Sequence, residues 1–410
     1  MAKALRRVSA LVITLILLLG ACQAGDTLRG LATDVSDFFY SLLPQQRAWQ
    51  DPVGTERTDA GGNSEIEAPP SRHYYNRLSE AQKQAYEEIL KAMPAFPQRI
   101  ELPELDKEEL AETVKAYSYD NPDRFNLGDS YTFLTQGKKR FLEPNYRFGK
   151  EEYEIALQKT QTAIETFMKV APVNGSDFEK ELAVHDYLTA RVLYQSDGQP
   201  YEATAYGALV LGKASCEGYA RAAKLLLEAL GIESLLNTGN ATNSGGTTQA
   251  HMWNCVKVDG QWYQLDVTWD DPGTDNGGVR RYDYFNLTDA ELALTHAQRD
   301  ELVKCTSTAA NYFRYRGLYF NEYNTAAKNA VSAAVKNNVK EGNYQVELRF
   351  SSTQVLLDEY EKLISSTKGD IYRMLETAAL ASDVRLVTNE INYSLNEQLG
   401  IIRIIFRLKY

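Results

Sequence analysis

The chain has 410 residues, of which 44% are hydrophobic, and a formal net charge of −11 at pH 7. This length and apolar content are sufficient for two or three folded domains with hydrophobic cores. The acidic balance argues against binding to nucleic acid, and against electrostatic attachment to anionic lipid or wall polymers, because like charges repel.

Residues 1–21 have the features of an export signal. Three basic residues precede an apolar run over residues 8–19 that is too short to span a membrane comfortably. The run ends in Leu19-Gly20-Ala21-Cys22, which resembles the cleavage site of bacterial lipoproteins. We therefore expect Cys22 to be lipidated and the protein to be anchored at the extracytoplasmic face of the bacterial cell membrane; ordinary secretion is the alternative. Without the signal, 41 basic residues face 55 acidic ones, so membrane attachment must come from acyl chains.

Residues 22–72 are expected to form the lipidated N-terminus and a flexible tether. Between residues 44 and 71, prolines and glycines lie among charged residues, and too few apolar groups are present to offset the entropy lost on ordering. The folded part of the chain would then stand away from the membrane surface.

Residues 73–172 predict a mixed, mainly helical region. Ser79 and Gln82 form a capping-box pair before a helix. Further helical patterns cover residues 107–117 and 151–170, and residues 129–135 predict a short strand. Ser176 and Glu179 cap the next helix, which carries His185, and we expect that histidine to be a packed structural residue.

Cys216 opens a predicted amphipathic helix. Apolar residues recur after it at helical spacing as far as Leu230, and Gly231 ends the helix. The unpaired N–H groups and the positive dipole end of a helix N-terminus favour thiolate over thiol. Cys216 is therefore a candidate nucleophile, provided that a base lies nearby.

His251 and Asp266 follow on a predicted β-hairpin. Its strands are joined by Asp259 and Gly260, a pair that favours a two-residue type I′ turn and so fixes the register. Counting outward, His251 faces Thr268, so His251 and Asp266 are diagonal neighbours on one face, roughly 7 to 8 Å apart at the backbone. The carboxylate can then orient the imidazole, and the histidine can take a proton from a thiol and return it to a leaving group.

Three motifs in this region together resemble the transglutaminase-like superfamily, which has a papain-like fold. They are C-E-G-Y from Cys216, H-M-W-N from His251 and W-Y-Q-L-D-V-T-W from Trp262. The resemblance predicts a catalytic domain over residues 173–320, and the lead-in from Tyr74 is similar to that of bacterial lipoprotein members. It implies an α+β fold in which the helix with Cys216 packs on an antiparallel sheet that carries the histidine and the aspartate.

The resemblance also implies a catalytic triad of Cys216, His251 and Asp266 that acts on amide bonds of proteins or peptides without a cofactor. The cysteine would form a thioester, which water or an amine resolves, so a cysteine protease and an acyltransferase both fit. Cell-wall peptides are candidate substrates. The backbone N–H of Cys216 is one expected oxyanion donor, and Tyr194 and Tyr206 are candidates for the second.

Two other classes of protein are alternatives to such an enzyme. The first is a non-catalytic module that keeps the fold to bind surface proteins or wall peptides. Such a module would tolerate the loss of a triad residue, whereas this chain retains all three, which favours the enzyme. An arylamine acetyltransferase has similar residues, but its acyl donor is cytoplasmic, which does not fit an exported protein.

The remaining cysteines, Cys255 and Cys305, are the pair left free to form a disulfide, which an exported setting permits. Two separately buried thiols are the alternative. The sequence has no C-x-x-C spacing of the kind that binds zinc. The acidic run over residues 270–278 does not fit an EF-hand and predicts a surface loop near the site, so we expect no metal.

Residues 321–410 predict a small α/β domain, for which we expect a stabilising or partner-binding role. Strands are expected at 344–350, 385–393 and 402–408, and helices at 353–365 and 370–381. Alternation in the last strand gives an apolar core face and directs Arg403 outward.

Overall fold

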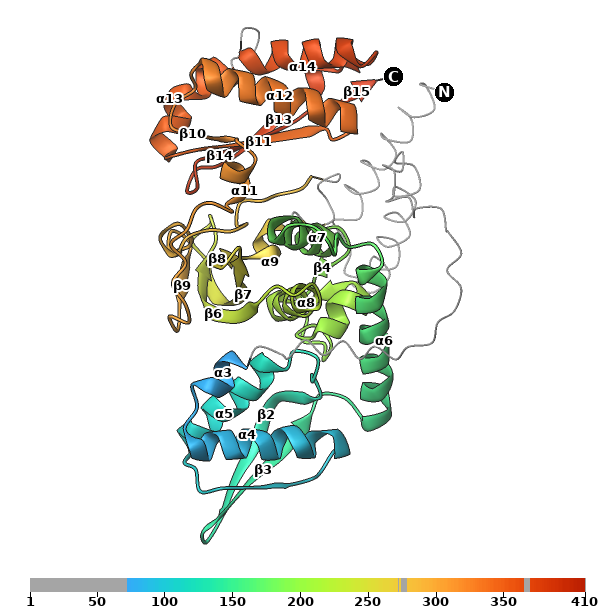
Figure 1. Cartoon of the computed structure of the whole chain (residues 1–410), viewed down its shortest axis with the longest axis vertical. Coiled ribbons are helices and arrows are strands. Elements are labelled where there is room, and N and C mark those ends of the chain that lie inside the picture. Colours follow the sequence, from blue (N-terminus) through green and yellow to red (C-terminus); the bar gives the residue numbers. More distant parts are fainter. Residues whose placement is uncertain (1–71, 272, 274–278, 365–368, 410) are drawn as a thin grey trace, which may run out of the picture. The chain divides into compact units, whose positions relative to one another are not determined.

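The computed structural model describes residues 72–409 apart from 272, 274–278 and 365–368 (Figure 1). The predicted signal segment, Cys22 and almost all of the predicted tether lie outside these residues. The described residues belong to one compact unit, Ala60–Tyr410. None of the helices in this part of the chain has both the length and the apolarity needed to cross a membrane.

The first described region combines three helices with a small antiparallel sheet. Strands β1, β3 and β2 pair in that order, and the helices α3, α4 and α5 complete a core of aromatic and aliphatic side chains. The elements are α3 His73–Asn76, α4 Glu80–Ala92, β1 Ile100–Leu102, α5 Lys107–Asp120, β2 Leu127–Gln136 and β3 Lys139–Tyr146. The capping box of Ser79 and Gln82 is confirmed, and the predicted strand is confirmed as part of the longer β2.

Helices α6, α7 and α8 form the helical half of the next region. They are α6 Lys150–Met168, α7 Asp177–Thr189 and α8 Cys216–Ala229. Ser176 and Glu179 form the predicted capping box at the start of α7. Between α7 and α8, the short parallel strands β4 Leu193–Tyr194 and β5 Lys213–Ala214 pair with each other, and β5 leads directly to Cys216.

A four-stranded antiparallel sheet packs against these helices and forms the other half of the region (Figure 1). Its order is β8-β7-β6-β9, with β6 Ser234–Thr242, β7 Thr248–Val258, β8 Gln261–Leu265 and β9 His296–Gln298. The short helices α9 Val267–Asp270, α10 Asp289–Leu292 and α11 Tyr312–Tyr315 accompany the sheet. The α+β fold, with the Cys216 helix packed on an antiparallel sheet, is confirmed.

The hairpin turn between β7 and β8 is as predicted, but the second strand is shorter. Asp259 and Gly260 have φ of 49° and 77°, the left-handed pair of a type I′ turn, and Val258 pairs with Gln261. The predicted pairing of His251 with Thr268 is wrong, because β8 ends at Leu265 and Thr268 belongs to α9. The backbone N–H of Asp266 donates to the carbonyl of Tyr284 instead of continuing the hairpin.

The last region is an α/β unit with two sheets, ordered β10-β11-β14-β13 and β12-β15. Its elements are β10 Tyr319–Phe320, α12 Thr325–Glu341, β11 Gln345–Phe350, α13 Thr353–Ile364, α14 Asp370–Ala381, β12 Arg385–Leu386, β13 Asn392–Asn396, β14 Ile401–Ile405 and β15 Leu408–Lys409. The long helix α12 is an addition to the predicted elements. The predicted strand over 385–393 is wrong as one element, because a 3₁₀ turn at Thr388–Glu390 divides it between the two sheets.

Arg403 is buried, which contradicts its predicted outward position. It lies opposite Glu347 on the neighbouring strand β11, and the two side chains form a buried ion pair. Strand alternation separates two faces but does not say that the second face is solvated, and here a carboxylate supplies the partner that burial of a guanidinium requires.

Three main clusters of buried apolar side chains follow the order of the chain. They span Tyr74 to Leu142, Ile164 to Ala310 and Phe320 to Leu408. The sequence-based domain boundary at 320/321 lies next to the gap between the second and third clusters, whereas 172/173 falls inside the second cluster, which already includes Ile164 and Phe167. Both boundaries stay predictions, because the clusters all belong to one compact unit.

Candidate active site

Cys216 is the first residue of α8 and is partly exposed. The preceding Ser215 is extended and makes no side-chain hydrogen bond to the first turn, so a side-chain cap does not neutralise the positive end of the helix. A Cβ on Gly218 would lie 2.4 Å from the carbonyl oxygen of Glu202, so only glycine lets the first turn pack this closely. The helix ends as predicted at Gly231, which has φ of 80°.

His251 lies on β7, 5% exposed, with different partners on its two ring nitrogens. Its Nε2 lies 2.7 Å from Oδ2 of Asp266, and the side chain of Cys216 is near enough to the ring to help raise its pKa. Because Nε2 is taken by the carboxylate, Nδ1 is the nitrogen that faces the thiol. The three residues singled out in the sequence therefore meet in one place.

Asp266 occupies the N-cap of α9, not a position within a strand. Its Oδ1 accepts a hydrogen bond from the backbone N–H of Trp269 at 3.2 Å, and its own N–H donates to the carbonyl of Tyr284 at 3.1 Å. Hydrogen bonds thus fix both the side chain and the backbone of Asp266. The carboxylate is buried, and its remaining oxygen points toward His251.

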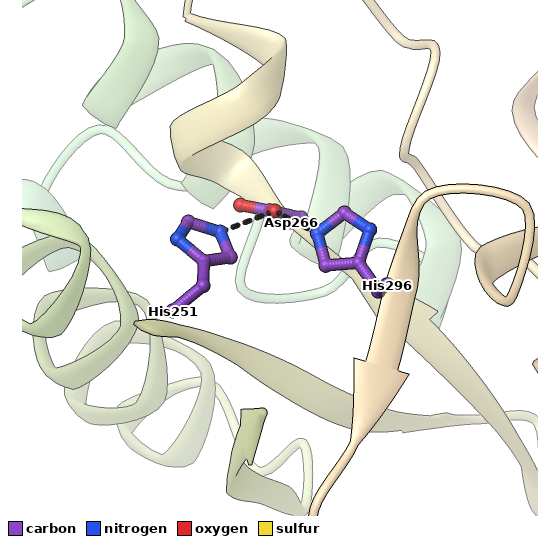
Figure 2. A group of neighbouring side chains, drawn as sticks. All are labelled: His251, Asp266 and His296. Atoms are coloured by element: carbon purple, nitrogen blue, oxygen red, sulfur yellow. Dashed lines mark hydrogen bonds and ion pairs between the residues drawn. The ribbon is translucent and has the colours of Figure 1, made fainter. Parts of the chain in front are cut away.

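His296 on β9 is a member of this group that the sequence reasoning missed. Figure 2 shows its imidazole on the side of the Asp266 carboxylate opposite His251. Its Nε2 lies 3.1 Å from the same Oδ2, and its Nδ1 lies 2.8 Å from the hydroxyl of Thr295. The strand β9 has three residues, too short for alternation to reveal which side chain faces the site.

The charges of the group support one another. Burial raises the pKa of Asp266, but His251 and His296 outweigh it and hold that pKa well below its usual range. Burial lowers the pKa of His251, but the Asp266 carboxylate and the nearby side chain of Cys216 outweigh it and raise that pKa to about 10. At neutral pH the arrangement therefore contains a carboxylate and an imidazolium next to the cysteine.

A cleft with a volume of about 300 Å³ opens beside His251. It is lined by Tyr194, Gln249, His251, Thr268, Trp269, Asp271 and Gly273. Tyr194 is 42% exposed there, and burial and the nearby Cys216 raise its pKa, which keeps its hydroxyl a donor at neutral pH. The other predicted oxyanion candidate, Tyr206, stacks on Phe125 in a separate aromatic cluster and does not line this cleft.

The motif residues that follow His251 tie β7 to its neighbours in the helix and in the sheet. Asn254 donates to the carbonyl oxygen of Ala220 in α8 at 3.0 Å and to the hydroxyl of Ser234 at 3.2 Å. Trp253 donates from its indole nitrogen to the side chain of Gln264 on β8 at 2.7 Å. These bonds explain why a tryptophan and an asparagine follow His251.

Cys255 and Cys305 lie side by side in a small buried cluster with Leu235. Both are free thiols in the structure. The hydrogen bond with Cys255, followed by burial, raises the pKa of the Cys305 thiol. Their proximity is compatible with a disulfide and with a pair of protonated thiols, so the disulfide stays a prediction.

His185 lies in the core of the domain, away from the cleft. Its Nδ1 lies 3.1 Å from Asp186 and its Nε2 lies 3.2 Å from Asp270. Asp270 was expected in a surface loop, and that expectation is wrong: it is the last residue of α9, fully buried, and accepts from the backbone N–H of Tyr284. Most of the rest of that run lies outside the described residues.

His251, Asp266 and His296 also form a group whose potential metal-binding atoms lie within 4.8 Å of one another. The separations of 2.7 and 3.1 Å between the carboxylate oxygen and the two nitrogens are ordinary hydrogen-bond distances. Each ring nitrogen near the carboxylate already has a partner, so we treat the three residues as a hydrogen-bonded group.

The fold and the site together define a papain-like α+β domain. Residues 169–267 match the family model of the transglutaminase-like superfamily, and the chain thus contains a domain of this superfamily. The match includes Cys216, His251 and Asp266, whereas His296 lies beyond it. Comparison with curated protein sequences gave no significant match.

Three solved structures are similar to parts of the chain. A transglutaminase structure titled "Crystal structure of a TGase" is 16% identical over 43% of this chain and 52% of its own, with a TM-score of 0.24. A putative cysteine protease from Cytophaga hutchinsonii is 14% identical over 34% and 61%, with a TM-score of 0.22. A putative protease from Parabacteroides distasonis is 11% identical over 33% and 35%, with a TM-score of 0.21. The chain thus covers less than two thirds of the length of each.

Proposed function

We propose that this protein is a cysteine enzyme that cleaves amide bonds of proteins or peptides through a thioester on Cys216. The observation that supports this most directly is the position of the His251 ring. It makes a hydrogen bond with the Asp266 carboxylate, and the Cys216 side chain is near enough to help raise the pKa of the ring. This is the relationship that a nucleophile, a general base and an orienting group require.

In the first step, the sulfur of Cys216 attacks the carbonyl carbon of a substrate amide, and His251 holds the thiol proton. The oxyanion accepts hydrogen bonds from the backbone N–H of Cys216 at the head of α8 and from the hydroxyl of Tyr194. The C–N bond then breaks, and His251 gives its proton to the leaving nitrogen. A thioester on Cys216 and a free amine result.

In the second step, His251 takes a proton from water or from an amine, which attacks the thioester carbonyl and releases the sulfur. Water gives hydrolysis, and an amine gives a transferred acyl group. Asp266 stays ionised in both steps and stabilises the imidazolium each time it forms.

The same proposal includes attachment to the extracytoplasmic face of the cell membrane through a lipid on Cys22. The apolar run of the first 21 residues and the motif that ends at Cys22 support it. A Cys22→Ala variant should lose the mass of the lipid and move from the membrane fraction to the soluble fraction. Wild-type protein without any lipid mass would contradict this part of the proposal.

The activity is tested by incubating the full-length protein with casein, with cell-wall stem peptides and with a primary amine, followed by mass spectrometry. The wild type should produce hydrolysed or amine-labelled products, and Cys216→Ala should produce none. Binding of casein or stem peptides without turnover, equal in wild type and Cys216→Ala, would favour the non-catalytic binding module.

A further inference from the structure

Two imidazoles that belong to different strands contact one carboxylate oxygen. His251 is on β7 and His296 is on β9, and β6 lies between these strands. Neighbouring strands are about 4.8 Å apart, so the backbones of β7 and β9 are separated by about 10 Å. The centroids of the two rings are nevertheless only 5.4 Å apart, so both side chains lean over β6.

Two small residues on β6 make this approach possible. His251 pairs with Gly239, and His296 pairs with Ala241. Positions directly opposite share a face, as do residues two apart, so all four lie on the same face of the sheet. A Cβ on Gly239 would lie 2.1 Å from the carbonyl oxygen of Ala297, so glycine is also required for β9 to pair at this position.

The two histidines share a partner at Nε2 and differ in what lies near Nδ1. An ionised carboxylate only accepts, so Nε2 carries a proton in both rings. The Nδ1 of His296 lies 2.8 Å from the hydroxyl of Thr295, a partner outside the His251–Cys216 pair. The Nδ1 of His251 faces Cys216 and is the one that exchanges a proton.

We propose that His296 is a positioning residue that fixes the Asp266 carboxylate for His251 and withdraws part of its negative charge from the His251–Cys216 pair. The proposal rests on the proposed function of that pair. The N–H of His296 competes with the N–H of His251 for Oδ2 of Asp266. The carboxylate therefore neutralises the positive charge of the His251 imidazolium less completely. More of the positive charge then remains to stabilise a thiolate on Cys216.

Among the residues that the structure describes, a small set of groups can contribute to this titration. The charged or titratable side chains in this set that face the pair are Asp266, His296, Tyr194 on β4, Tyr284, and Asp271 at the cleft. Trp253 and Trp269 pack against both imidazoles and separate them from water. Loss of the His296 N–H would therefore act directly on the carboxylate, without solvent to replace it.

The test measures how fast iodoacetamide modifies Cys216 in the full-length protein across a range of pH, resolved by peptide mass spectrometry. His296→Leu should move the pH at which the rate rises with thiolate formation upward by about one unit, and so slow the reaction on that rising part of the profile about tenfold. In His296→Gln the amide nitrogen reaches the position of Nε2, so its rate should stay within about threefold of wild type. In His296→Asn the shorter amide reaches only the position of Nδ1, so this variant should behave like His296→Leu.

The Gln and Asn variants are both polar amides, so they decide the question if His296→Leu does not fold. His73→Gln, in α3, is the control for replacing a histidine outside the site, and it should leave the profile unchanged. The proposal would be overturned if His296→Leu and His296→Asn both fold and the rate of Cys216 modification rises over the same pH range as in the wild type. Equal effects of Gln and Asn would also overturn it, because they would indicate packing and not the N–H.

His251→Ala separates this inference from the proposed function. If that variant is modified as fast as wild type, the proposed function of the Cys216–His251 pair fails. If His251→Ala slows the reaction and the His296 variants do not, only the role of His296 fails.

Discussion

The side chain of Asn254 in β7 donates a hydrogen bond to the backbone carbonyl of Ala220, one turn after the start of α8. This bond joins the strand that carries the proposed base to the helix that carries the proposed nucleophile. It therefore helps to fix the separation between His251 and Cys216.

Removing this bond should lower both stability and reactivity. We expect Asn254→Ala to reduce the free energy of unfolding by about 1 to 3 kcal/mol, because it removes a buried side chain and its hydrogen bonds. Iodoacetamide modification of Cys216 should also slow, since the base and the thiol would be held less closely. Urea unfolding checks the first effect. Asn240→Ala, an exposed position on the adjacent strand, is the control and should change neither quantity.

The pH dependence of activity should differ from that of cysteine modification. The raised pKa of His251, about 10, means that the imidazolium is present at lower pH and is lost as the pH rises through that value. Turnover needs this proton for the leaving amine, so it should fall near pH 10. Modification by iodoacetamide needs only the thiolate and should not fall there. Parallel loss of both above this pH would contradict the assignment of His251 as the general acid.

Replacing the carboxylate should impair catalysis much more than folding. Asp266→Asn keeps an oxygen that can cap α9, but an amide does not stabilise an imidazolium. We expect turnover to fall by about 10²-fold to 10⁴-fold. Circular dichroism and thermal unfolding should show a folded protein. A variant that keeps more than about a tenth of wild-type turnover would exclude Asp266 as a charged member of the group.

Gly239 should not tolerate even a methyl group. Because its added Cβ would meet backbone atoms of β9, which cannot rotate away, Gly239→Ala should lower the free energy of unfolding by about 2 to 3 kcal/mol. Chemical denaturation measures this difference. The control is Gly245→Ala in the β6–β7 connection, where the new atom would meet only the side-chain oxygen of Asn243 at 3.3 Å. Equal stability of the two variants would show that β9 can shift freely.

Local signals were enough to predict the elements around the proposed nucleophile. The start of α8 at Cys216, its end at Gly231 and the turn at Asp259–Gly260 depend on neighbouring residues alone. The end of β8, in contrast, depends on a residue distant in the sequence. Residues 267–269 are β-branched or aromatic and favour a strand, but the bond from Asp266 to Tyr284, 18 residues away, directs the chain into α9.

The positions of His296 and Arg403, which the sequence did not predict, are set by contacts with residues distant in the sequence. His296 reaches the site because β9 pairs with β6, more than fifty residues earlier. Arg403 is buried because Glu347 lies on the adjacent strand. Periodicity within one segment indicates which residues share a face, and it does not indicate what covers that face.

The central claim is that Cys216 is a nucleophile activated by His251. Its most direct test compares the rates at which iodoacetamide modifies Cys216, Cys255 and Cys305 at neutral pH in the folded wild type and in His251→Ala. We predict that Cys216 reacts far faster than the two buried cysteines in the wild type, and that His251→Ala removes most of this advantage. Equally slow modification of all three cysteines, or a rate at Cys216 that does not depend on His251, would contradict the claim.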